Sequence, residues 1–122
     1  MQMFSNLPED EEPAAIMRKL AGFGERYRAL FQDMARQYGL HIIGGTHPVV
    51  RKDVVYNVAH LFTPTGMVYT QDKLHVTARE RAQWSLRNGS RLCVFETPLT
   101  RIAIQVGYDI EFPEPTRLLT LA

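Results

Sequence analysis

Apolar residues follow two different periods along this chain of 122 residues. Between positions 27 and 38 they recur with the spacing of one helical stripe: Tyr27, Leu30, Phe31, Met34 and Tyr38. Gly39 suits the end of that helix, because glycine readily adopts the left-handed conformation found there. We expect the stripe to pack in the core. A shorter helix is predicted before it, starting near Pro13 after the acidic run 9–12 and interrupted at Gly22 and Gly24.

From residue 40 onward the pattern is typical of β-strands. Residues 54–62 alternate between two faces, and "TPTG" at 63–66 forms a turn into a strand at 67–71, which predicts a hairpin. Further strands are expected at 40–45, 91–97 and 101–106, the last two paired across Pro98.

The stretch "IQVGYDIEFPE" at 104–114 predicts a buried strand that bends at Gly107 and enters a helix at Pro113. Helices followed by hairpins and a strand–turn–helix indicate an α/β fold, or a layered α+β fold, in a single domain over 1–122. Such a strand–turn–helix normally returns to another parallel strand. We therefore expect the chain to be a partial domain.

Composition narrows the possible functions. A formal net charge of +1 without a clustered basic face argues against nucleic-acid and membrane-surface partners. Cys93 is the only cysteine, which predicts a reducing compartment such as the cytoplasm, and its strand context predicts a buried thiol. The four histidines have no metal-ligand spacing, so we expect neither a metal nor another cofactor.

Three segments carry candidate chemistry in a fixed order: "DKLHV" (72–76), "ARERAQW" (78–84) and "GYDIEFPEPTRLL" (107–119). Together with "IIGGTHP" (42–48) they resemble the nitrilase superfamily of carbon–nitrogen hydrolases, in particular a branch sometimes fused to an acetyltransferase. The resemblance implies an αββα sandwich, small amide or nitrile substrates, and a homo-oligomer in the full-length form. It also implies that the N-terminal strand–helix unit and the C-terminal half of the domain lie outside 1–122.

The resemblance also assigns roles to single residues. Lys73 matches the lysine that stabilises developing charge, and Glu80, on the short connection after the hairpin, resembles a supporting glutamate. Gly107 stands where the family has its nucleophilic cysteine, and the Tyr108 N–H would complete the oxyanion hole. The general-base glutamate of the family lies upstream of the matching segment, and Glu9 is not taken as its replacement.

Simpler interpretations remain open at this point. Lys73 would otherwise be a surface lysine, Glu80 and Arg81 a solvated charge pair, and Gly107 a turn glycine. On the family interpretation the chain is an inactive hydrolase domain, because the nucleophile and the base are missing. The alternative is a non-catalytic relative that serves binding or assembly. The sequence decides neither the substrate nor amidase against nitrilase activity.

Overall fold

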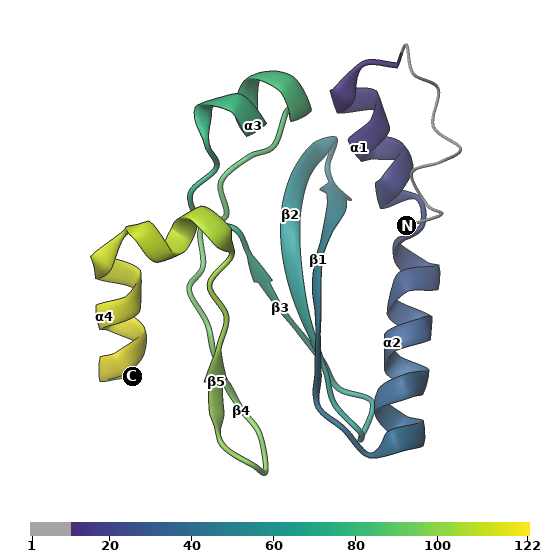
Figure 1. The fold of residues 1–122 in the computed structure, drawn as a ribbon, viewed down its shortest axis with the longest axis vertical. Coiled ribbons are helices and arrows are strands. Elements are labelled where there is room, and N and C mark those ends of the chain that lie inside the picture. The colour runs from purple at the N-terminus through teal and green to yellow at the C-terminus, as the bar shows by residue number, and fades with distance from the viewer. Residues whose placement is uncertain (1–10) are drawn as a thin grey trace.

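The computed structural model describes residues 11–122, which form a layered arrangement of helices and two small sheets (Figure 1). The expectations about Glu9 and the acidic run before residue 11 lie outside these residues. The α-helices are α1 (Pro13–Ala21), α2 (Gly24–Tyr38), α3 (Ala78–Trp84) and α4 (Pro113–Leu121), and a 3₁₀ helix, η2 (Gly107–Glu111), precedes the last. The strands are β1 (Ile42–Arg51), β2 (Val54–Phe62), β3 (Val68–Asp72), β4 (Val94–Glu96) and β5 (Arg101–Ala103).

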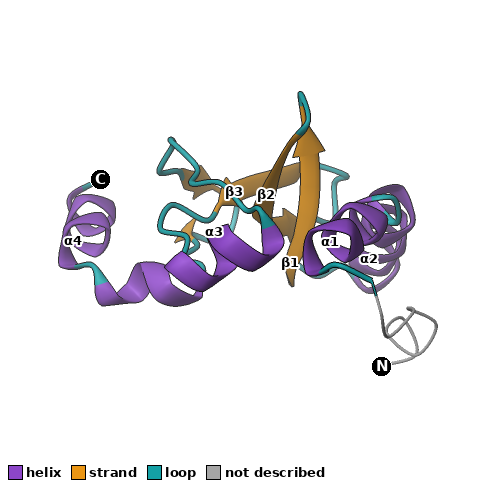
Figure 2. Cartoon of the chain, turned by 90° about the horizontal axis from the view of Figure 1, so that it is seen from above, coloured by secondary structure: helices purple, strands orange, loops and turns teal. Residues whose placement is uncertain are grey.

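The sheets are antiparallel and contain few strands. One has the order β1-β2-β3, and the other pairs β4 with β5. Helices α1 and α2 lie on one side of the larger sheet, the β4–β5 pair lies on its other side, and α4 lies beyond that pair (Figures 1 and 2). This order of layers confirms the α/β class and corresponds to part of an αββα sandwich.

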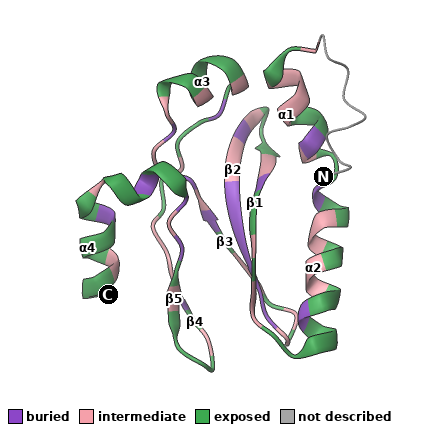
Figure 3. Cartoon of the chain, viewed as in Figure 1, coloured by how far each residue is buried: buried purple, intermediate pink, exposed green. Residues whose placement is uncertain are grey.

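Residues 58–62 of the central strand β2 are buried on both faces (Figure 3). One face carries His60 and Phe62, whose rings contact Tyr27 of α2. The other face carries Ala59 and Leu61, which pack in the core between the two sheets with Phe95, Ile104 and Val106. The alternation in the sequence therefore separates two buried faces, rather than a buried face from a solvated one.

Helix α2 corrects the expectation for its apolar stripe. Tyr27 and Phe31 pack toward the sheet, but Leu30, Met34 and Tyr38 are 58%, 37% and 63% exposed. Of the stripe, Tyr27 and Phe31 contact Phe62 of β2, whereas the other three residues lie at the surface. The predicted end of the helix is confirmed, because Gly39 has the left-handed conformation with φ 63°.

Strand β1 is longer than the predicted 40–45 and forms a hairpin with β2 that the sequence analysis missed. The connection is Lys52-Asp53, and both residues have positive φ. Pro48 lies within β1, where the missing N–H is tolerated because β1 is an edge strand of its sheet. The β2–β3 hairpin is confirmed, whereas β4 and β5 are shorter than the predicted 91–97 and 101–106.

Candidate functional site

Lys73 directly follows β3, and its main chain is fixed on both sides. Its N–H donates to Asn57 O of β2 at 2.8 Å, and its carbonyl accepts from Gly89 N at 2.8 Å. Gly89 has no room for a side chain, since a Cβ there would lie 2.5 Å from the Asp72 Cβ. The lysine is 5% exposed, which excludes the interpretation as a surface residue.

Glu80 lies on the connection after the β2–β3 hairpin, as predicted, and this connection forms helix α3. Thr77 caps this helix: its hydroxyl accepts from Glu80 N, and the Glu80 carboxylate accepts from Thr77 N at 2.8 Å. The same carboxylate accepts from Lys73 Nζ at 2.7 and 3.0 Å. Arg81 instead donates to Asn88 at 3.1 Å, so the solvated Glu80–Arg81 pair is not formed.

The pKa of Glu80 reflects this pairing. Burial alone raises the pKa of the carboxyl, but the hydrogen bonds from Lys73 and Thr77 outweigh burial, and the pKa is lowered from its ordinary value. Glu80 is therefore a carboxylate at neutral pH and holds the lysine by two charge-assisted hydrogen bonds.

Gly107 is at the bend that the sequence predicted, and Lys73 points to it. The backbone at Gly107 has φ 52°, and η2 begins there. A Cβ built on this glycine would lie 3.8 Å from Lys73 Nζ, and no other heavy atom of the described residues, apart from the two chain neighbours, comes within 4 Å of it. Position 107 therefore faces the lysine ammonium across an otherwise open space.

Tyr108, whose N–H was assigned to the oxyanion hole, directly follows the bend. Tyr108 is 37% exposed and its ring contacts Phe112 edge-on at 5.0 Å. Cys93 was expected to be a buried strand thiol, but it lies just before β4 and is only half-buried, packed against the core between the sheets. Its N–H donates to the buried Gln71 side chain at 2.9 Å. The structure thus brings Lys73, Glu80 and Gly107 together, and no atom of Cys93 lies within 4 Å of the Cβ built at Gly107.

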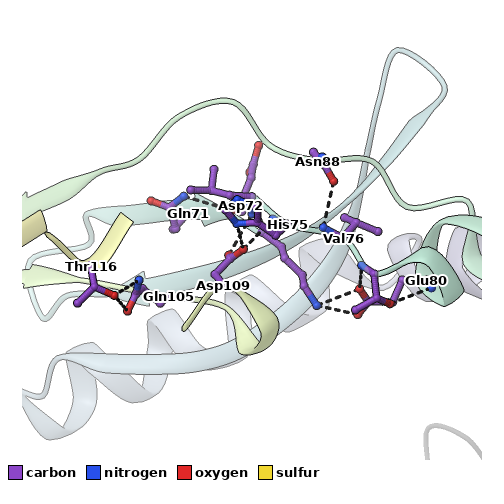
Figure 4. A network of polar contacts seen from close by, with 12 residues as sticks. Gln71, Asp72, His75, Val76, Glu80, Asn88, Gln105, Asp109 and Thr116 are labelled. Atoms are coloured by element: carbon purple, nitrogen blue, oxygen red, sulfur yellow. Dashed lines mark hydrogen bonds and ion pairs between the residues drawn. The ribbon is translucent and has the colours of Figure 1, made fainter. Parts of the chain in front are cut away.

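Asp109 was missed as a residue of this site. It is 2% exposed, and its carboxylate accepts hydrogen bonds from Leu74 N at 3.0 Å, His75 N at 2.7 Å and His75 Nδ1 at 2.9 Å (Figure 4). The His75 ring also stacks on Phe112, with centroids 3.8 Å apart. The sequence holds one signal for it, an aspartate two residues after the bend in "GYDIEFPE".

The described residues contain neither a metal-binding cluster nor a membrane-spanning helix. Among residues 11–122, no three His, Cys, Asp or Glu side chains lie close enough to hold a metal ion. Over that range no helix is both long and apolar enough to cross a membrane.

A lysine paired with a carboxylate and facing the bend at Gly107 is the arrangement that the resemblance to the carbon–nitrogen hydrolases predicts. The carbon–nitrogen hydrolase family profile matches residues 9–122. The chain belongs to the carbon–nitrogen hydrolase family.

Named relatives and solved structures agree with this assignment. A probable hydrolase of Bacillus subtilis, YhcX, is 41% identical over 90% of this chain, and a nitrilase of Pyrococcus abyssi is 32% identical over 95%. Omega-amidase NIT2 of Danio rerio is 32% identical over 75% of the chain. The crystal structure of a carbon–nitrogen hydrolase from Helicobacter pylori superposes on 84% of the chain with a TM-score of 0.76 at 21% identity, which shows a common fold.

The chain spans only part of each relative. It covers 21% of the Bacillus protein, 43% of the Pyrococcus protein, 35% of the Danio protein and 36% of the Helicobacter structure.

Proposed function

We propose that this chain is a carbon–nitrogen hydrolase-type domain that retains the lysine–glutamate pair of the site and is inactive because Gly107 occupies the nucleophile position. The single observation that carries the proposal is the 3.8 Å between Lys73 Nζ and a Cβ built at Gly107. At that separation a side chain at 107 would sit directly against the ammonium.

The proposed chemistry of an intact site assigns each group one task. A cysteine thiol at 107 would give its proton to a general-base carboxylate, and the thiolate would attack the carbonyl carbon of a small amide. Lys73 and the Tyr108 N–H would stabilise the oxyanion, the amine would leave with a proton, and water would hydrolyse the thioester. A nitrile would enter by attack on its carbon in the same way.

Two parts of this sequence of steps have no counterpart among residues 11–122. Gly107 offers no sulfur, and within that range Glu80 is the only carboxylate bonded to Lys73. Because Glu80 is committed to the ammonium and to Thr77, we assign it a supporting role and not that of the base. We expect the chain to bind small amides or nitriles without turning them over.

The names of the relatives support amides as the first substrates to test, since several are amidases and one is a nitrilase. We also propose that the protein is located in the cytoplasm, because its sequence has a single cysteine and therefore no internal disulfide. We further propose that the full-length form is a homo-oligomer.

The test introduces a thiol at the bend. In a Cys93→Ala background, Gly107→Cys is alkylated with iodoacetamide across pH, and the rate profile gives the thiol pKa. We expect a value below the ordinary 8.5 or so, because Lys73 favours the thiolate. Adding Lys73→Met should return it toward that value.

Gly39→Cys in the same background is the matched control. Gly39 also has positive φ, 63°, but no atom of the described residues lies within 4 Å of its built Cβ, so its thiol should titrate normally. An ordinary pKa for the thiol introduced by Gly107→Cys, unaffected by Lys73→Met, would contradict the proposal. Turnover of a small amide by the unaltered chain, with a burst of acyl-enzyme, would contradict the inactive state.

The alternative, a module kept for binding or assembly, is favoured by one observation: the part-buried Lys73–Glu80 pair is complete although the nucleophile is absent. It is distinguished by ligand titration followed by NMR. Shifts at Gly107 and Tyr108 with a small amide, without turnover, support a binding role.

A further inference from the structure

Two segments far apart in sequence meet at the site, and one side chain joins them. Lys73 lies at the start of the segment 73–76, which is neither helix nor strand, and Gly107 starts η2. The side chain between them is that of Asp109, which belongs to η2 and is buried.

We propose that Asp109 is a positioning residue: it clamps the main chain of residues 74 and 75 to η2 and thereby fixes the Lys73 ammonium opposite position 107. This inference rests on the proposed function, because it concerns how the lysine meets the nucleophile position.

The contacts of Asp109 are directed at the backbone that follows Lys73. Both carboxylate oxygens are used, Oδ2 by Leu74 N at 3.0 Å and Oδ1 by His75 N at 2.7 Å. His75 Nδ1 lies 2.9 Å from the same Oδ1, so its side chain adds a third bond (Figure 4). Two successive N–H groups bonded to one carboxylate set the direction of the chain at its point of attachment to Lys73.

The clamp is also protected from solvent. Asp109 is 2% exposed, and the His75 ring is covered by Phe112, whose plane lies at 11° to it. In such surroundings an unpaired N–H or carboxylate is costly, so the bonds favour one arrangement of the two segments. Glu80 holds the ammonium end of the Lys73 side chain. Asp109 holds the main chain at the two residues that follow Lys73.

The experiment uses the thiol pKa of the full chain carrying Gly107→Cys and Cys93→Ala. Asp109→Asn keeps the shape of the side chain but replaces one acceptor oxygen by a donor. If Asp109 acts by positioning, Lys73 moves away and the thiol pKa rises toward about 8.5, the ordinary value of cysteine. If Asp109 acts only as a nearby negative charge, its removal lowers the thiol pKa. The two roles thus predict opposite signs.

A second background makes the test specific. With Lys73→Met, the rise caused by Asp109→Asn should vanish, because there is no ammonium left to misplace. Asp72→Asn is the matched control, because it removes a carboxylate one residue before Lys73. The Asp72 side chain accepts from Arg51 at 2.7 and 3.0 Å and does not contact η2 by a hydrogen bond. It should leave the pKa of the thiol introduced at position 107 unchanged.

His75→Ala is the milder variant if Asp109→Asn does not fold. It removes one of the three bonds and the stacking on Phe112, and we expect a smaller rise of the same sign. A fall or no change in both variants overturns the inference. Loss of the Lys73→Met effect itself would instead overturn the proposed function, so the two failures are distinguishable.

Discussion

At the scale of single residues, the left-handed backbone at Gly107 has a measurable cost for any side chain. Space is not the obstacle, because Lys73 Nζ is at an ordinary contact distance from the built Cβ. The obstacle is φ 52°, a conformation that costs an L-residue about 1–2 kcal/mol.

We therefore predict that Gly107→Ala lowers the free energy of unfolding by about 1–2 kcal/mol. Urea unfolding followed by circular dichroism measures this. Gly39→Ala shares the positive φ and lacks any described neighbour within 4 Å, so it should cost about the same. A much larger loss at 107 than at 39 would show that the site resists a side chain for steric reasons.

Part of the candidate site could be predicted from the residues alone. Lys73 and the bend at Gly107 were recognised from their motifs, and the structure places them together. The contact between Lys73 and Glu80 could not be decided, because a surface pair with Arg81 fits the same letters. Asp109 was missed because its partner His75 is 34 positions away, and such contacts leave no periodic signal in sequence.

At the scale of elements, the β1–β2 hairpin has a two-residue turn with positive φ at both positions but no glycine. Both Lys52 and Asp53 have positive φ, 48° and 65°, as a two-residue turn of this kind requires. Neither is glycine. The sequence analysis missed the turn for this reason: "KD" is not a hairpin signal, whereas "TPTG" before β3 is one.

We predict that Asp53→Gly stabilises the chain by about 0.5–1 kcal/mol, because glycine adopts this conformation without strain. The substitution removes the ion pair between the Asp53 carboxylate and Arg18, which contributes little because the carboxylate is 99% exposed and 3.7 Å from the arginine. The hydrogen bond from Arg18 to the main-chain oxygen of residue 53 is kept. Thermal unfolding compares the variant with Asp53→Asn. A drop in melting temperature for Asp53→Gly would contradict this account.

At the scale of the whole molecule, packing of α2 on the sheet buries two histidines. His60 is 2% exposed and His47 6%, and both rings contact Tyr27. Burial lowers the pKa of His60 to about 4 and lowers that of His47, each partly offset by a hydrogen bond to a backbone carbonyl. The folded state therefore holds both rings neutral at pH values where the unfolded chain protonates them.

Stability should consequently fall as pH decreases from about 6.5 toward 4, because the unfolded state binds more protons over that window. For His60 alone the loss between pH 7.5 and 5 is about 2 kcal/mol. Urea unfolding at these two pH values measures it. His60→Phe should show a smaller pH dependence, and an unchanged dependence would exclude His60 as its cause.

The sequence predicted the kinds of elements in each layer, but it did not predict which faces of those elements are buried. Strand alternation identified β2, but it could not show that both of its faces are buried, because that depends on what packs against each side. The same reason explains α2, where an apolar stripe predicted core packing for Leu30, Met34 and Tyr38 that the single sheet beneath the helix does not provide.

The hydrogen bond from Gly89 to Lys73 has a consequence for how such a site can change over time. It closes the stretch 73–89 on itself, and the lysine, its glutamate and the capped helix all lie inside this closed unit. The ion pair therefore needs nothing from position 107 in order to form. A lineage can lose its reactive sulfur and still inherit the charged pair intact, because no side chain at position 107 takes part in that pair.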